Sequence, residues 1–368
     1  MISNWLFVLH RLAYDESNKG PAVTIVRWLL SFLSFLYWLG IMSKRALLNA
    51  RVLTPKKLDC MVISVGNITW GGTGKTPLIE MLAKVLTAEG RKVAVLLRGY
   101  GKKVSAKRKP AMEWMETGDE ASLLKKNLPG IHILADKDRL KSGRLAIKKY
   151  GVDTLLLDDG YQHWKIDRDF DIVAINGNNP FGNGRLLPRG ILREPISAIS
   201  RADIVCFTKV DDRDTTELQV KLKDINHNLL FVESIHTPVY LYDFYAKKRL
   251  IPEDIRGNSV ILFSGVGDPD SFKDNIIRLG AKVKTDFRYP DHYVYREKDI
   301  EDIFTTAMKS GVETVVTTEK DIVKVGPLLN EFHNLASKPV RVLSLRIELK
   351  IIKNERELID RLVSIYKC

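Results

Sequence analysis

A glycine-rich stretch at residues 66–77, GNITWGGTGKTP, carries the residue types that hold a nucleoside triphosphate. Glycines let backbone N–H groups turn inward around a polyphosphate. Lys75 is suited to contact the β- and γ-phosphates, and the Thr76 hydroxyl is suited to ligate Mg²⁺. Thr69 stands where the usual P-loop spacing has glycine, and we expect the Gly71–Gly72 pair to supply the missing flexibility. The predicted nucleotide-binding residues are Thr69, Gly71, Gly72, Thr73, Gly74, Lys75 and Thr76.

The elements expected on either side of this stretch are those that a P-loop requires. Residues 59–65, DCMVISV, are an apolar run typical of a buried strand, and residues 78–89 have apolar side chains at helical spacing. The N-terminus of that helix would add positive potential beside the phosphates. The alternative, a glycine-rich turn with a chance Gly-Lys-Thr, is disfavoured because both flanking elements fit.

A second group of candidate residues follows the apolar run 154–157, TLLL. An aliphatic strand that ends in aspartate, beyond a P-loop, is the Walker B pattern. We expect Asp158 to hold Mg²⁺ and Asp159 to assist the metal or to act as a base. Two further candidate bases, Asp119 and His292, have plainer alternatives as a helix N-cap and a surface turn residue.

Two arginines are candidate clamps for phosphate, because the guanidinium fork matches phosphate oxygens. Arg98 follows a strand predicted at 92–97, and Arg193 lies in a long loop at 178–195 that is rich in Gly and Pro. Either arginine could equally form a structural ion pair. Residues 208–211, TKVD, resemble the guanine-reading NKxD element of GTPases, but a turn at the end of a strand is the favoured interpretation.

Strands and helices alternate along the chain, which predicts an α/β fold with mainly parallel sheets. We expect a P-loop NTPase-type lobe and a second, smaller α/β lobe, preceded by a membrane-associated helix. The expected domains are an anchor segment at 1–50, a kinase core lobe at 51–238 and a C-terminal lobe at 239–368. Further strands are predicted at 131–135, 170–176, 203–207, 259–263, 281–287, 313–317 and 340–347, and helices at 121–127, 138–149, 271–279, 298–309 and 355–366.

The N-terminal region is apolar enough to contact a membrane. Residues 28–42, WLLSFLSFLYWLGIM, carry no charge, and extension back to Pro21 gives enough length to cross a hydrocarbon core of about 30 Å. We expect this segment either to span the bilayer or to lie in one leaflet, with an ordinary buried helix as the alternative. The basic residues that follow indicate the cytoplasmic, anionic side, and they are Lys44, Arg45, Arg51, Lys56 and Lys57.

The composition is that of a basic globular protein. The chain has 368 residues, 45% of them hydrophobic, and a formal net charge of +13. A basic chain suits an anionic membrane surface, a phosphorylated substrate or nucleic acid. We exclude nucleic acid, because the basic residues are not interleaved with aromatics in a recognisable binding module, and we infer no obligate protein partner. The three cysteines are scattered, odd in number and without metal-ligand spacing, and this pattern indicates a reducing compartment.

Taken together, the motifs resemble one family. In chain order they read GNITWGGTGKTP, RGYG, GDE, LDDGYQH, PRGILREP, DH followed by Tyr295, and TEKD. With the apolar N-terminal helix, this series is similar to the tetraacyldisaccharide 4′-kinase family of lipid A biosynthesis, from the first helix to about Asp321. The resemblance implies a kinase of the bacterial inner membrane that uses ATP and Mg²⁺, with its catalytic lobes on the cytoplasmic face. The implied acceptor is the 4′-hydroxyl of an acylated glucosamine disaccharide 1-phosphate, and the implied product is lipid IVA.

The resemblance also implies roles for particular residues. In that family the aspartate of GDE pairs with the histidine of DH to activate the hydroxyl, and these positions are Asp119 and His292 here. The paired Walker B aspartates match Asp158 and Asp159. This chain has Tyr293 at a position where the family often has a second histidine.

Two other classes of protein remain alternatives at this point. A P-loop GTPase or metallochaperone-like switch would prefer guanine and would hydrolyse nucleotide without lipid. A membrane-tethered ATPase would respond to a protein partner and would have no small-molecule acceptor.

Overall fold

The computed structural model describes residues 20–99, 118–211, 213–333 and 340–367. The first part of the predicted anchor segment, and Tyr100 and Gly101 of RGYG, lie outside these ranges. The chain divides into two compact units. The first comprises Met1–Lys75, Asp159–Ser234 and Ile351–Cys368, and the second comprises Thr76–Asp158 and Ile235–Lys350. The domain boundaries predicted at residues 50 and 238 stay predictions.

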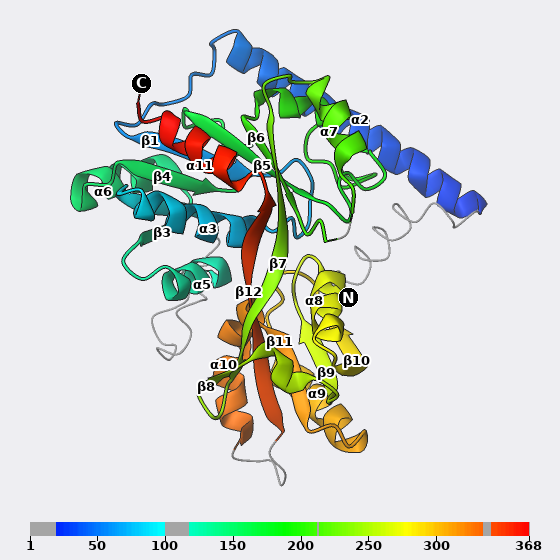
Figure 1. The fold of residues 1–368 in the computed structure, drawn as a ribbon. Coiled ribbons are helices and arrows are strands. Elements are labelled where there is room, and N and C mark those ends of the chain that lie inside the picture. Colours follow the sequence, from blue (N-terminus) through cyan, green and yellow to red (C-terminus); the bar gives the residue numbers. More distant parts are fainter. Residues whose placement is uncertain (1–19, 100–117, 212, 334–339, 368) are drawn as a thin grey trace, which may run out of the picture. The chain divides into compact units, whose positions relative to one another are not determined.

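Parallel strands form the centre of the first unit (Figure 1). They are β1 (Met61–Gly66), β5 (Phe170–Asn176), β6 (Ile204–Thr208) and the first part of β7 (Leu230–Asp243), hydrogen-bonded in that order. Most residues of β1, β5 and β6 are buried, which explains why they read as continuous apolar runs instead of alternating ones. Because these strands are parallel, their carboxyl ends share one edge, where the loops with polar motifs begin.

Helices and an apolar core complete the first unit. Tyr161 and Phe207 are fully buried and pack with side chains from β5, β6 and the loop at 190–202. The helices are α2 (Pro21–Asn49), α7 (Thr216–Lys223) and α11 (Glu355–Ser364), with a 3₁₀ turn, η2 (Ile196–Arg201).

The second unit contains a first set of three parallel strands. β2 (Val93–Arg98) pairs with β4 (Thr154–Asp158) on one side and with β3 (His132–Asp136) on the other. Asp138 caps the N-terminus of α6, because its carboxylate accepts hydrogen bonds from the N–H groups of Leu140 and Lys141. The helices that accompany this set are α3 (Lys75–Ala88), α5 (Asp119–Asn127) and α6 (Arg139–Tyr150).

A second set of parallel strands in the same unit runs in the order β10, β9, β11, β12. Its core is aliphatic and aromatic, with Phe263 and Tyr295 in edge-to-face contact. The elements are β8 (Lys248–Leu250), η3 (Pro252–Ile255), β9 (Ser259–Ser264), α8 (Pro269–Arg278), β10 (Lys282–Arg288), α9 (Glu297–Lys309), β11 (Thr314–Thr318), α10 (Glu319–His333) and β12 (Arg341–Lys353).

The predicted fold class, α/β with mainly parallel strands after an apolar helix, is confirmed. The alternative role of Asp119 as a helix N-cap was wrong. The N-cap residue of α5 is Gly118, and Asp119 is the first residue of the helix itself. From that position the Asp119 carboxylate accepts the N–H of Glu120 at 3.0 Å and does not cap the helix. The same carboxylate also contacts His292.

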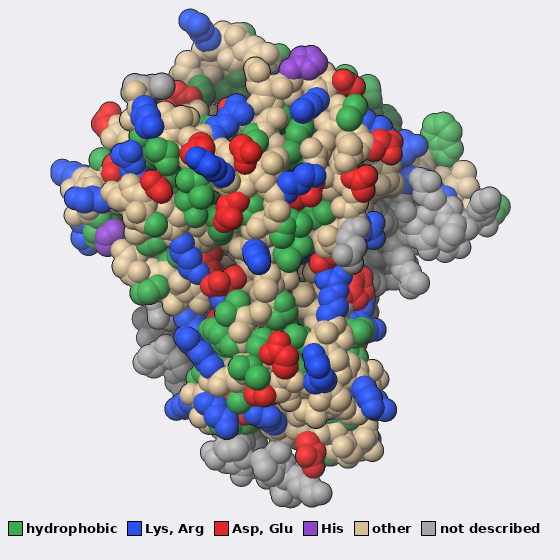
Figure 2. All heavy atoms as spheres, in the orientation of Figure 1, with side chains coloured by type: hydrophobic (Ala, Val, Ile, Leu, Met, Phe, Trp, Pro, Cys, Tyr) green, Lys and Arg blue, Asp and Glu red, His purple; other side chains and the backbone are tan. Residues whose placement is uncertain are grey.

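Most of the large apolar side chains of α2 are exposed at the surface. The helix is long and apolar enough to cross a membrane. Trp28 is 75% exposed and Phe32 58%, whereas Ser34 is buried. On the face shown in Figure 2, by contrast, Lys and Arg side chains are scattered among acidic ones, so the net positive charge is not gathered there in one patch.

Candidate active site

The glycine-rich stretch forms a loop between β1 and α3. Gly71 (φ 113°) and Gly74 (φ 74°) have left-handed backbone conformations, which turn the chain before Lys75 begins α3. Thr69 is buried and forms an isolated antiparallel β-bridge with Leu192 of the 178–195 loop. The conformation that requires glycine therefore lies at Gly71 and Gly74, which explains why a threonine is accommodated at position 69.

Residues of the LDDGYQH motif pack against the start of this loop and hydrogen-bond to it. A Cβ on Gly66 would lie 2.5 Å from the Cβ of Tyr161, so the close approach of these segments requires glycine. The Gln162 amide donates to the carbonyl of Asn67 at 2.8 Å, and the Asn67 amide donates to the Thr73 hydroxyl at 3.1 Å. The motif therefore has a structural role in supporting the loop.

The TKVD tail of β6 lies against the same loop. The Thr208 hydroxyl donates to the carbonyl of Thr73, and the Lys209 ammonium donates to the carbonyl of Gly72, each at 2.8 Å. Because C=O and N–H point in opposite directions across a trans peptide, the N–H of Gly74 points away from β6. Sequence reasoning missed this support, although parallel strands of one sheet place their carboxyl-terminal residues at one edge.

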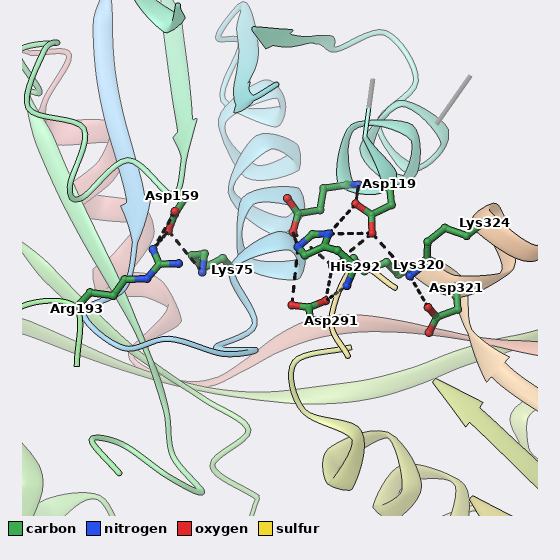
Figure 3. Close-up of polar contacts among 10 residues, drawn as sticks. Lys75, Asp119, Asp159, Arg193, Asp291, His292, Lys320, Asp321 and Lys324 are labelled. Carbon is green, nitrogen blue, oxygen red and sulfur yellow. Dashed lines mark hydrogen bonds and ion pairs between the residues drawn. The ribbon is translucent and has the colours of Figure 1, made fainter. Parts of the chain in front are cut away.

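Lys75, Asp159 and Arg193 form one cluster in the first unit (Figure 3). The Arg193 guanidinium donates to both oxygens of Asp159, at 2.7 and 2.9 Å. The Lys75 Nζ lies 3.7 Å from the same carboxylate. Arg193 therefore forms the structural ion pair that the sequence left as an alternative. Its partner, Asp159, is also the residue that faces Lys75. Its role as a phosphate clamp stays a prediction.

The predicted metal residues both belong to the second unit. Thr76 is the second residue of α3, and Asp158 is the last residue of β4 and is buried. Arg98 ends the neighbouring parallel strand β2 and is exposed, so it lies at the same sheet edge as Asp158. No group of three or more His, Cys, Asp or Glu residues in the described part of the chain has the arrangement of a metal site.

Asp119 and His292 are in direct contact, although 173 residues separate them in the sequence (Figure 3). The His292 Nδ1 lies 3.1 and 3.2 Å from the two oxygens of Asp119. His292 follows β10 in a turn and has a left-handed backbone conformation (φ 59°), which directs its ring toward the start of α5. The structure thus brings together the two residues that the family resemblance pairs.

Two lysines that sequence reasoning did not single out complete this second cluster. Lys320 Nζ lies 3.1 Å from Asp291 and 3.7 Å from Asp119. Lys324 Nζ lies 2.7 Å from Asp321 and 3.9 Å from Asp119. The two lysines are four residues apart on α10 and so share a helix face. The TEKD motif and this spacing were the available signal.

The charges around Asp119 determine the protonation of the pair. Burial raises the pKa of Asp119, but the hydrogen bond from His292 and the charges of Lys320 and Lys324 outweigh burial, and the pKa lies well below its ordinary 3.8. The hydrogen bond to Asp119 raises the pKa of His292 above its ordinary 6.5. The same contact therefore favours the carboxylate form of Asp119 and the imidazolium form of His292. The stabilisation from Asp119 is lost as the pH falls through its lowered pKa, and that from His292 as the pH rises through its raised pKa.

Tyr293, at the position where the related family often has histidine, anchors the turn that carries His292. Its hydroxyl donates to Asp299 at 3.1 Å and accepts from Arg296 at 3.2 Å. Its ring stacks on Tyr289, with 4.7 Å between centroids. The tyrosine therefore fixes its neighbour through the N-terminus of α9.

The fold and these two clusters define a P-loop nucleotide-binding protein of the α/β class, with a carboxylate–histidine pair suited to accept a proton from a hydroxyl. Comparison with known proteins makes this class more specific. Residues 26–366 match the family described as tetraacyldisaccharide-1-P 4′-kinase. The chain belongs to the tetraacyldisaccharide 4′-kinase family.

Individual relatives agree with this assignment. The chain is 38% identical to the tetraacyldisaccharide 4′-kinase of Halothermothrix orenii, over 88% of this chain and 90% of that one. It is 39% identical to the one from Syntrophus aciditrophicus, over 82% and 84%. Among solved structures, it is similar to LpxK from Aquifex aeolicus in complex with ATP, with a TM-score of 0.66 and 30% identity over 90% of this chain and 97% of that one.

Proposed function

We propose that this protein transfers the γ-phosphoryl group of ATP to the 4′-hydroxyl of an acylated glucosamine disaccharide 1-phosphate, giving lipid IVA. The observation that carries this proposal is the contact between Asp119 and His292. A sugar hydroxyl is a poor nucleophile near neutral pH, and a positioned carboxylate can accept its proton. The same chain carries a P-loop that begins α3 with Lys75.

ATP fits the glycine-rich loop in the first unit. The left-handed conformations of Gly71 and Gly74 let backbone N–H groups face a polyphosphate, and Lys75 supplies a positive charge. The ATP in the Aquifex aeolicus relative supports the choice of nucleotide. The kinase names of the relatives favour this reading over a GTPase switch or a partner-driven ATPase.

In the proposed reaction, the 4′-oxygen of the acceptor attacks the γ-phosphorus while the bond from that phosphorus to the β,γ-bridging oxygen breaks. The hydroxyl proton moves to the Asp119 carboxylate, and ADP leaves. A carboxylate of low pKa is a weak base. The proton is therefore expected to move late, after the bond between the 4′-oxygen and the γ-phosphorus has begun to form in a loose transition state. His292 orients the carboxylate through Nδ1, and Lys320 holds it ionised.

The donor set of the second unit fits Mg²⁺. Mg²⁺ prefers oxygen ligands and is usually bound by one or two carboxylates together with substrate phosphates. Thr76 offers a hydroxyl and Asp158 a buried carboxylate at the end of β4. When bound, the ion would neutralise charge on the phosphates, and Asp159 would assist beside Asp158.

Replacing Asp158 by asparagine is expected to lower kcat by about 10²-fold or more while the fold persists, because a neutral amide holds Mg²⁺ poorly. The measurement is kcat as a function of Mg²⁺ concentration. The matched control is Asp153→Asn, an aspartate just before the same strand, which should keep the wild-type Mg²⁺ dependence. An unchanged Mg²⁺ dependence in Asp158→Asn would show that this residue does not hold the ion.

Helix α2 supports a membrane location for the enzyme. Its exposed apolar side chains fit membrane association, and the basic residues after it suit an anionic surface. We place the protein on the bacterial inner membrane with its catalytic lobes, at 51–238 and 239–368, on the cytoplasmic side, where the lipid acceptor and ATP are both accessible. No nucleic acid or obligate protein partner enters this proposal.

Changing Trp28 and Phe32 together to serine is expected to reduce binding to anionic lipid vesicles by about 10²-fold or more, because burial of each large apolar side chain contributes about 1.5–3 kcal/mol. Sedimentation with vesicles that contain phosphatidylglycerol measures this binding. Exposed Val220 on α7 provides the control, because Val220→Ser should sediment like the wild type. Equal sedimentation of all three proteins would remove α2 from the membrane contact.

The proposed reaction is tested by identifying its product. Purified protein in detergent is incubated with ATP, Mg²⁺ and an acylated disaccharide 1-phosphate, and the lipid is analysed by mass spectrometry. We expect one added phosphate, located on the non-reducing glucosamine by fragmentation. A phosphate on the other sugar, or an unmodified lipid with ATP consumed, would refute the assignment.

A further inference from the structure

Helix α2 contacts the nucleotide-binding unit through a polar face that membrane binding does not explain. Ser34 is buried on a helix whose large apolar residues are exposed. Its hydroxyl lies 2.9 Å from the carbonyl of Leu186 and accepts the N–H of Arg189 at 3.1 Å. Three residues later, on the same face, the Tyr37 hydroxyl donates to the carbonyl of Arg193 at 2.9 Å. Both side chains therefore bind the backbone of one loop, 186–193.

The 186–193 loop is closely packed and internally hydrogen-bonded, so a displacement of one end is expected to displace the other. Gly190 has no space for a side chain, because a Cβ there would lie 2.2 Å from the carbonyl oxygen of Arg185. Leu192 donates its N–H to the same carbonyl at 3.1 Å, and Leu187 donates to the carbonyl of Leu192 at 2.9 Å.

The same loop is hydrogen-bonded to the P-loop. Trp70 donates its N–H to the carbonyl of Ile191 at 2.6 Å, and Arg193 donates its N–H to the carbonyl of Ile68 at 2.7 Å. Beyond the backbone, the Arg193 side chain holds Asp159, whose carboxylate is 3.7 Å from Lys75. A continuous series of hydrogen bonds and ion pairs thus runs from α2 to the phosphate-binding loop and to its lysine.

We propose that Ser34 and Tyr37 are positioning residues for the nucleotide site, so that α2 is a structural part of the ATP-binding unit in addition to its role at the membrane. Loss of either hydroxyl removes a fixed point of the 186–193 loop. The P-loop segment at 68–70 and Arg193 then lose their defined position. Small displacements of residues that hold phosphates weaken nucleotide binding, because the site depends on fixed geometry. The inference rests on the proposed binding of ATP, and not on the identity of the acceptor.

The test measures ATP binding by calorimetry, in detergent and without lipid acceptor. Ser34→Val is expected to raise the Kd for ATP by about tenfold, and Tyr37→Phe by about threefold to tenfold, the range for losing one or two hydrogen bonds. Ser34→Thr keeps the hydroxyl and should restore most of the affinity. The matched control is Ser31→Val, because the Ser31 hydroxyl bonds the carbonyl of Arg27 within the helix and should leave Kd unchanged.

Two readouts separate positioning from general destabilisation. The melting temperatures of Tyr37→Phe and Ser31→Val should equal that of the wild type, and the KM for ATP should rise in Tyr37→Phe while the KM for the lipid acceptor stays constant. If Ser34→Val does not fold, Tyr37→Phe decides the question.

Wild-type ATP affinity in Tyr37→Phe and in folded Ser34→Val would overturn the inference. An equal loss in Ser31→Val would also overturn it, because the effect would then belong to the helix as a whole. Loss of ATP binding in every protein, wild type included, would instead contradict the proposed nucleotide site. A wild type that binds ATP but does not phosphorylate the lipid would leave this inference standing and refute the proposed acceptor.

Discussion

Replacing Lys75 by methionine is expected to lower kcat by about 10³-fold, the loss typical for removing one group that stabilises transition-state charge. Lys75 begins α3 directly after the left-handed Gly74. In the proposed site its ammonium contacts the transferred phosphoryl group. Methionine keeps a long unbranched side chain but removes the charge. Asp159 keeps its ion pair with Arg193 in this variant, so the fold should persist. Steady-state turnover with ATP and the lipid acceptor is the measurement.

The control for this variant is Lys148→Met, which removes an exposed lysine from the last turn of α6. It loses the same charge far along the chain from the loop and should keep wild-type kcat. Near-normal turnover in a folded Lys75→Met protein would show that the glycine-rich loop is not the site of phosphoryl transfer.

Asp119→Ala and His292→Ala are each expected to lower kcat by about 10²–10⁴-fold, the usual contribution of a positioned acid or base. In the proposed reaction Asp119 takes the proton, and the Nδ1 of His292, 3.1 Å from the carboxylate, orients it. Because the two residues act as a unit, the double variant should be little slower than the slower single variant. The Kd for ATP should change little in all three, since neither residue belongs to the glycine-rich loop.

Losses that multiply in the double variant would mean that the two residues act independently. A fully active Asp119→Ala would move the base to Asp159 or to water. Asp119→Asn separates charge from shape, because the amide keeps the size of the side chain but cannot accept the proton, and it should be nearly as slow as Asp119→Ala.

The sequence predicted the buried strands well because each is a short, nearly continuous apolar run between polar turns. β5 begins and ends where it was expected, at Phe170 and Asn176. β7 was not predicted, because its burial changes from continuous to intermittent after Ser234 and no single period describes its fourteen residues. α10 was also missed. Pro327 lies inside this helix, and a proline within a periodic segment normally signals its end.

The chemistry of the site was partly readable from local patterns. The P-loop and the Walker B aspartates lie within short segments whose spacing has a physical reason. The pairing of Asp119 with His292 came from family resemblance, since no local pattern joins residues so far apart. The support that Thr208 and Lys209 give to the P-loop depends on strand order, and the contacts of Ser34 depend on tertiary packing.

The most direct test of the central claim follows the γ-phosphoryl group of labelled ATP, with purified protein in detergent and with or without the acylated disaccharide 1-phosphate. We expect the label to move onto the disaccharide when it is present, and ATP to be consumed only slowly when it is absent, because the proposed base, Asp119, acts on the acceptor hydroxyl. Release of the label as inorganic phosphate at the same rate with and without the acceptor would contradict this account.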